Sequence, residues 1–293
     1  MRLGEKSPNE TGAPPVDCRT IPSPMRMRVL VGLIVATSVA AVPPAADAKS
    51  SRRTSKSQTH PTHRTQKTKV TKKRAARIST LRERDRVETR ELTRGQSIGL
   101  PWEGHLQHPA QLAPGDGYFI RRPYRSFGTE TTVDFIERAI ADTLEAFPDQ
   151  HVLAIGDISA ESGGKITEHH SHQSGRDADI GLFYKEQPAG YPASFIHADE
   201  DNLDCAATFK LLESFLATAN DDGGAQVIFL DFDVQGILYD WALDHGISQR
   251  RLDRIFQYPH GRGSPEGMVR HEPNHDNHMH VRFRCPSEDT SCS

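Results

Sequence analysis

Two short stretches of the sequence hold seven of its fifteen histidines. One is HHSHQSGRDAD, residues 169–179, and the other is HEPNHDNHMH, residues 271–280. Imidazole and carboxylate groups together are the usual ligands of catalytic zinc. These two stretches are therefore the first place to look for a metal centre.

The second stretch leads into an expected strand, residues 278–284. Side chains two positions apart in a strand point to the same face. His278 and His280 then share one face, while Met279 and Val281 point toward a core. A His-x-His pair alone is a weak signal of metal binding, because surface histidines are common.

The first stretch contains a turn signal, Ser-Gly-Arg, between His172 and Asp179. Gly175 lets the chain bend there, so that these two side chains can converge. With His280 they form three ligands and leave a fourth position open, as in catalytic zinc sites. A water bound at such a position has a pKa of about 7. We therefore predict one zinc ion held by His172, Asp179 and His280.

Three neighbours could assist the chemistry. His278 would lie beside the water, as a general base or as a cation that stabilises an oxyanion. His275 is a second candidate for that role. Asp177 shares a strand face with Asp179 and could orient a ligand, although a solvated acidic edge is the alternative.

Other catalytic classes lack their motifs. The sequence contains no Gly-x-Ser-x-Gly, no His-Glu-x-x-His and no phosphate-binding Gly-rich loop. Cys205 begins an apolar helical stretch, which is typical of a buried free thiol and not of an activated nucleophile.

The N-terminal third has the composition of an exported protein. Arg26 and Arg28 precede an apolar run, residues 29–42, and Ala46-Asp47-Ala48 is typical of a cleavage site. The run is shorter than the roughly 20 residues that span a bilayer. We expect residues 1–48 to be leader and signal peptide, no transmembrane segment in the mature chain, and a periplasmic location.

Residues 49–94 carry 16 Lys and Arg against four Asp and Glu. The segment has few large apolar residues, which predicts a disordered linker. It acts either as a solvated spacer or by adhesion to anionic envelope polymers. No aromatic residues are interleaved for base stacking, so nucleic acid is excluded as a partner.

Residues 95–293 suit one domain. Helices are expected at 132–147, 206–219 and 234–245, and strands at 150–158, 177–183, 225–229 and 278–284. Without a regular βαβ rhythm, this order predicts an α+β fold, with a small antiparallel sheet flanked by helices and a single zinc site. Cys285 and Cys292 lie seven apart, and a disulfide between them fits an oxidising compartment.

Three segments resemble a known family, the penicillin-insensitive murein endopeptidases of the lysostaphin/D-Ala-D-Ala metallopeptidase group. They are GDISAESGGKITEHHSHQSGRDADIGLF, HDNHMHVRFRCPSEDTSC and QSIGLPWEGHLQHPAQLAPGDGYFIRRPYRSFG. The resemblance extends over roughly residues 95–293.

The resemblance implies the same zinc ligands, with His278 as catalytic histidine, His275 as a further active-site histidine and Cys285–Cys292 as a disulfide. His169 matches a histidine that can bind a second metal. Arg125 matches an arginine that could pair with a substrate carboxylate, although a structural ion pair is the alternative. The family's Asp-x-x-His is only partly present, because Ala207 follows Asp204 where the histidine would stand. One zinc is therefore expected, not two.

The resemblance further implies hydrolysis of peptide cross-links in peptidoglycan, of the D-alanyl-diaminopimelate type. Two alternatives stay open at this point. One is a D,D-carboxypeptidase acting on stem peptides, and the other is a cell-wall-binding module that retains zinc without catalysis.

Overall fold

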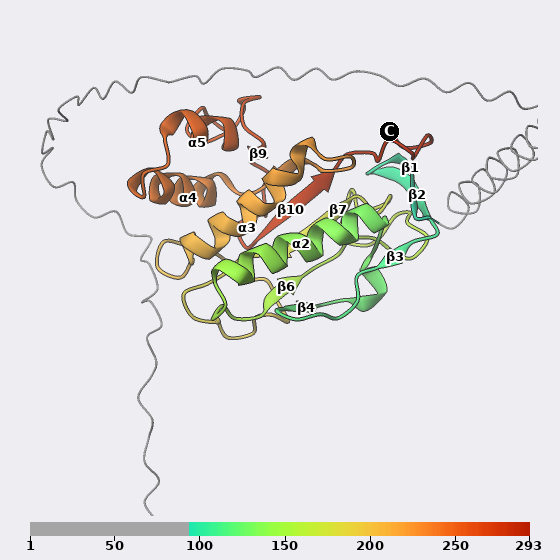
Figure 1. Ribbon diagram of the computed structural model, residues 1–293, viewed down its shortest axis with the longest axis horizontal. Helices are drawn as coiled ribbons and strands as arrows, with labels where there is room; N and C mark the ends of the chain where they lie inside the picture. Colours follow the sequence, from blue (N-terminus) through green and yellow to red (C-terminus); the bar gives the residue numbers. More distant parts are fainter. Residues whose placement is uncertain (1–93) are drawn as a thin grey trace, which may run out of the picture. The chain divides into compact units, whose positions relative to one another are not determined.

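The computed structural model describes residues 94–293, with a six-stranded sheet at the centre (Figure 1). The expected leader, signal peptide and nearly all of the basic linker lie outside the described residues. The strands are β1 Gln96–Leu100, β2 Glu103–Gln107, β3 Ala110–Gln111, β4 Tyr118–Ile120, β5 Phe127–Gly128, β6 Leu153–Ile155, β7 Asp177–Gly181, β8 Ala225–Phe229, β9 Val269–Arg270 and β10 His278–Phe283. The helices are η1 Pro123–Arg125, α2 Glu130–Ala146, α3 Cys205–Ala217, η2 Thr218–Asn220, α4 Phe232–Asp244 and α5 Gln249–Ile255.

The central sheet has the order β4-β6-β7-β10-β8-β9. Its three central pairings are antiparallel, as expected, but β4 pairs with β6 and β8 with β9 in parallel. Parallel neighbours need a crossover connection. The chain supplies one through α2 and another through α4 and α5. The fold is therefore α+β, and its sheet is mixed and not wholly antiparallel.

Helices α2 and α3 cover one face of this sheet (Figure 1). The side chain of Thr129 caps α2 by accepting a hydrogen bond from the backbone N–H of Thr132. Phe135 of α2 and Phe215 of α3 pack on Phe283 of β10, with ring centroids 5.9 and 6.3 Å apart. Alternation along β10 therefore leaves its other face for His278 and His280, as the sequence pattern predicted.

Most expected elements are present, with their ends shifted by a few residues. The strand expected at 150–158 is shorter, Leu153–Ile155. The carbonyl of Asp157 still accepts from the N–H of Asp179 in β7. The chain then leaves the sheet, because the N–H of Ile158 donates to the carbonyl of Arg125 instead of to a neighbouring strand. Short strands such as β3 and β9 have no sequence pattern and were not expected.

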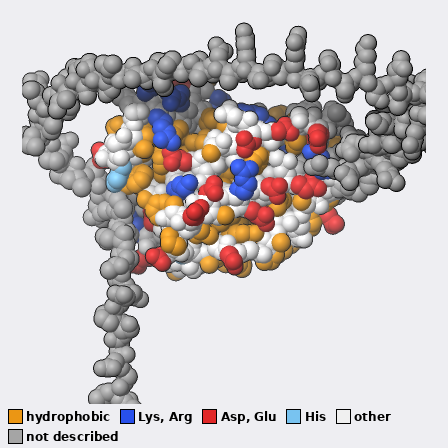
Figure 2. All heavy atoms as spheres, viewed as in Figure 1, with side chains coloured by type: hydrophobic (Ala, Val, Ile, Leu, Met, Phe, Trp, Pro, Cys, Tyr) orange, Lys and Arg blue, Asp and Glu red, His pale blue; other side chains and the backbone are white. Residues whose placement is uncertain are grey.

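The exposed side of α2 is acidic, and Figure 2 shows acidic side chains over much of the face viewed. The exposed acidic residues of this helix are Asp134, Glu137, Asp142 and Glu145. Within residues 94–293, no helix is long and apolar enough to cross a membrane.

Cys285 and Cys292 form the expected disulfide. It closes a C-terminal loop that docks on β1, where the N–H of Gly99 donates to the carbonyl of Ser291 at 2.8 Å. The expectation for Cys205 was half wrong. Cys205 is fully buried, but it is disulfide-bonded and not a free thiol.

Candidate metal centre

Antiparallel pairing of β7 with β10 brings the two histidine-containing stretches together. The register places His280 opposite Asp179 and Arg282 opposite Asp177. Asp177, Asp179 and His280 are all buried, so none is a solvated edge residue. These side chains lie on the face of the sheet that α2 and α3 leave open.

His172 reaches the same place through the predicted turn. Gly175 has a φ of 71°, and a Cβ there would lie 2.9 Å from the side chain of Leu106, so the position requires glycine. His172 itself has a φ of 64°, a conformation that costs about 1–3 kcal/mol. Its backbone N–H donates to Asp177 Oδ2 at 3.0 Å, which holds it in that conformation.

Hydrogen bonds determine which nitrogen of each histidine carries a proton. His172 Nδ1 lies 3.0 Å from the carbonyl of Ile158, which only accepts, so Nδ1 is the donor. His280 Nε2 donates to Asp177 Oδ1 at 3.0 Å. The other nitrogens, His172 Nε2 and His280 Nδ1, lie 3.2 and 3.3 Å from Asp179 Oδ1. These two nitrogens therefore lie against the same oxygen of Asp179.

Two of these atoms have no hydrogen-bond partner among the described residues. They are His172 Nε2 and Asp179 Oδ1, both buried. Their contact has the distance of an ion pair but not the geometry of a hydrogen bond. Buried polar atoms without partners are costly. A cation between them would satisfy both, so the residues present fit a metal ion.

The pKa values show the same demand for positive charge. Burial alone would raise the pKa of Asp179, but the charges of His172 and His278 hold it well below its ordinary value. Burial would lower the pKa of His280, but the charge and hydrogen bond of Asp177 raise it to about 9. Negative charge that favours a protonated His280 also favours a cation at its Nδ1, the nitrogen that faces Asp179.

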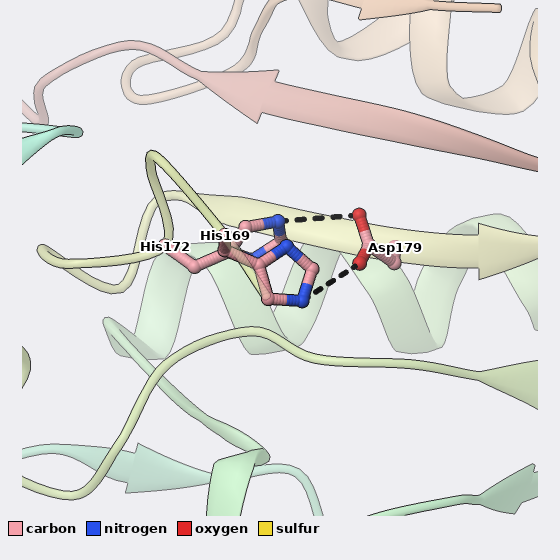
Figure 3. Close-up of side chains that lie close together, drawn as sticks. All are labelled: His169, His172 and Asp179. Carbon is pink, nitrogen blue, oxygen red and sulfur yellow. Dashed lines mark ion pairs between the residues drawn. The ribbon is translucent and has the colours of Figure 1, made fainter. Parts of the chain in front are cut away.

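His169 lies against the same carboxylate from another side. Figure 3 shows His169 and His172 both pointing at Asp179, each toward a different oxygen. His169 Nε2 is 3.8 Å from Asp179 Oδ2, but it is closer, 3.0 Å, to Asp157 Oδ2. Potential ligand atoms of His169, His172 and Asp179 lie within 4.8 Å of one another, and so do those of Asp157, Glu168 and His169.

Arg125 contacts the second of these groups, which contains Asp157. Its Nη1 pairs with Asp157 Oδ2 at 2.8 Å, and its Nη2 donates to Thr167 Oγ1 at 2.6 Å. Arg122 pairs with the other oxygen of Asp157 at 2.9 Å. The guanidinium of Arg125 is thus engaged within the protein, and its role toward a substrate stays a prediction.

His278 flanks the three ligands from β10. Its Nδ1 lies 2.6 Å from Asn277 Oδ1, which accepts from it, and its Nε2 is 3.6 Å from Asp179 Oδ1. Burial lowers the pKa of His278 to about 4, although Asp179 opposes this. His275 lies alongside, with ring centroids 4.8 Å apart. His278 therefore directs an unprotonated nitrogen toward the ligand cluster.

A stack of side chains fixes the ring of His278. Phe195 lies parallel to it, 4.6 Å between centroids and 8° between planes, and the guanidinium of Arg121 lies 4.2 Å from the centroid of the Phe195 ring. Gly156 makes room for this stack. A Cβ at Gly156 would lie 2.8 Å both from the Phe195 ring and from Asp179 Cβ.

All of the predicted histidines open onto one cavity of about 500 Å³, apart from buried His172. Sequence analysis did not single out Asp157, Phe195 or Trp102 as parts of this region. Asp157 had a signal, since it follows an apolar strand and precedes the histidines. Phe195 lies in a loop without periodicity, and no sequence signal indicates its position.

Comparison with known proteins agrees with this geometry. Residues 97–208 match the sequence pattern of a family described as penicillin-insensitive murein endopeptidase. That range contains His169, His172 and Asp179, while β10 lies beyond it.

Individual relatives carry the same name. A penicillin-insensitive murein endopeptidase of Yersinia pestis is 28% identical over 208 residues, which cover 67% of this chain and 69% of the relative. One from Yersinia enterocolitica is 29% identical over 194 residues, 63% of each chain. One from Yersinia pseudotuberculosis is 29% identical over 209 residues, 67% of this chain and 69% of the relative. The chain is therefore similar to penicillin-insensitive murein endopeptidases, by the family pattern at residues 97–208 and by these relatives over about two thirds of its length.

Proposed function

We propose that this chain is a zinc-dependent peptidase that hydrolyses peptide cross-links in bacterial peptidoglycan, at D-alanyl-diaminopimelate bonds. The observation that carries the proposal is the convergence of His172 Nε2 and His280 Nδ1 on Asp179 Oδ1, with two of these buried atoms lacking a hydrogen-bond partner among the described residues. Similarity to penicillin-insensitive murein endopeptidases suggests the substrate.

His172, Asp179 and His280 would hold the zinc, because two imidazoles and one carboxylate with an open position are a catalytic zinc donor set. When bound there, zinc supplies a Lewis acid that polarises a carbonyl and lowers the pKa of water. Asp177 orients His280 by accepting its Nε2–H, and Ile158 orients His172 in the same way through its carbonyl.

His278 is the group that we assign to proton transfer. Its Nδ1–H donates to Asn277, so Nε2 carries a lone pair and faces the ligand cluster. It can take a proton from the attacking water and return it to the leaving amine. His275 lies beside it and is the second candidate.

The remaining parts of the chain complete the proposal. Residues 1–48 would direct export to the periplasm, and residues 49–94 would tether the domain at 95–293 through positive charge to anionic envelope polymers. Of these two segments the structure describes only Arg94, which pairs with Glu288 at 2.9 Å.

The test uses the purified full-length chain and isolated peptidoglycan sacculi. Mass spectrometry of the products should reveal loss of cross-linked dimers, block by a chelator, and recovery with added zinc. Release of terminal D-alanine from monomeric pentapeptides, without cleavage of dimers, would replace the proposal with a D,D-carboxypeptidase. Zinc bound at the site without any hydrolysis would indicate a binding module.

A further inference from the structure

Trp102 is an exposed aromatic residue on the wall of the same cavity. It lies in the turn between β1 and β2, and 52% of its surface is exposed. It also lines a neighbouring cavity of about 520 Å³, where Arg176, Arg282 and Arg284 gather. Trp102 and Arg282 line both cavities, so they form the ridge between them.

Arg282 packs against the indole of Trp102. The guanidinium of Arg282 lies 5.6 Å from its centroid and 5.4 Å from that of Phe229. Arg282 cannot move freely, because its Nε donates to Asp177 Oδ1 at 2.7 Å. The turn is anchored as well, since the carbonyl of Pro101 accepts from the N–H of Gln173, next to His172. The exposed part of the indole is therefore a preformed flat surface.

The chemistry of such a surface selects its ligand. The face of an aromatic ring carries partial negative charge, and it attracts groups with partial positive charge on a flat underside. The axial C–H groups of a pyranose ring fit this description. Ligand cavities are lined largely by hydrophobic and aromatic side chains, and Trp102 supplies an aromatic wall to this cavity.

Distance fits the sugar of a cell-wall polymer. Arg282 lies two residues beyond His280 on β10, about 7 Å along the strand. An extended stem peptide spans about 3.5 Å per residue. A stem of a few residues can therefore reach from the ligand cluster to the indole. We propose that Trp102 binds a pyranose ring of the glycan strand that carries the cleaved peptide; this rests on the proposed function.

The test compares two substrates with identical cross-linked peptides. One dimer keeps its disaccharides, and the other has had them removed enzymatically. The intact chain should cleave the disaccharide-bearing dimer with about five- to tenfold higher kcat/KM, through a lower KM. Trp102→Ala should reduce this ratio to about one, and Trp102→Phe should keep most of it. Phe119→Ala, an exposed aromatic of β4, is the matched control and should leave the ratio unaltered.

Fluorescence supplies a readout that needs no cleavage. The chain has two Trp residues, so Trp241→Phe leaves Trp102 as the single indole. Its emission should shift saturably with an uncross-linked disaccharide-peptide and not with the same peptide without sugars. Equal kcat/KM for both dimers in the unmodified chain, or no difference between the two titrations, would overturn the proposal. Absence of cleavage of either dimer would instead count against the proposed function.

Discussion

Two groups of histidine and carboxylate side chains lie side by side, and they differ in how their charges are balanced. In the first, the ion-pair partners of Asp179 among the described residues are all histidines, two of them His172 and His280. In the second, Asp157 already has two arginines, Arg122 and Arg125, as ion-pair partners. The first group needs an added cation, while the second contains its own. Similar residue types thus leave a place that a cation would fit in one case and form an ion-pair cluster in the other.

Removing a proposed metal ligand of the first group should have the largest effect on metal binding and activity. His280→Ala should abolish both metal binding and cleavage of cross-linked dimers, because one of three protein ligands is lost. The fold should persist, since Asp177 keeps its bonds to Arg282 and to the backbone of His172. Metal analysis, muropeptide digestion and circular dichroism check this. His245→Ala, at the end of α4, is the control. Full metal content in the His280→Ala chain would remove the assignment.

A more conservative substitution tests whether the carboxylate of Asp177 raises the metal affinity of the first group. Asp177→Asn keeps the size of the side chain but removes the negative charge that His280 faces. We expect metal affinity to fall about 10- to 100-fold, as for other residues that orient a ligand. Competition with a chromophoric chelator measures it. Asp142→Asn on the exposed side of α2 should alter affinity little, and equal losses in both variants would contradict the role of Asp177.

A substitution in the second group should lower the stability of the fold and leave metal binding unaltered. Arg125→Ala leaves one oxygen of buried Asp157 with a weaker set of partners, which should lower the free energy of unfolding by about 1–3 kcal/mol. Urea unfolding measures this, with Arg138→Ala, 61% exposed, as the control. Metal content should stay at one ion per chain. Unaltered stability with a strongly raised KM would show that Arg125 binds substrate instead.

Strand alternation and a turn signal were sufficient to predict that the side chains of the first group lie close together. A period of two residues put His278 and His280 on one face, and the bend at Gly175 brought His172 toward Asp179. Alternation could not reveal which strands are neighbours, so the parallel edges of the sheet were missed. The sequence also did not predict the ion pair between Arg122 and Asp157 in the second group. These residues are 35 positions apart and meet only through tertiary packing.

The smallest expected effect concerns orientation in the first group. Phe195→Leu removes the flat surface that holds the ring of His278 and leaves the ligands themselves untouched. We expect kcat to fall about three- to tenfold, because small misplacements of a reacting group lower the rate, while KM and metal content stay close to their original values. Phe195→Tyr keeps the ring and should restore kcat, and Phe119→Leu on β4 is the size-matched control. A loss of metal, or equal rates in Phe195→Leu and Phe195→Tyr, would mean that Phe195 only fills space. A lower kcat with an unaltered KM would instead show that Phe195 positions His278. Within the first group, buried hydrogen bonds would then orient the ligands, while aromatic stacking orients the base.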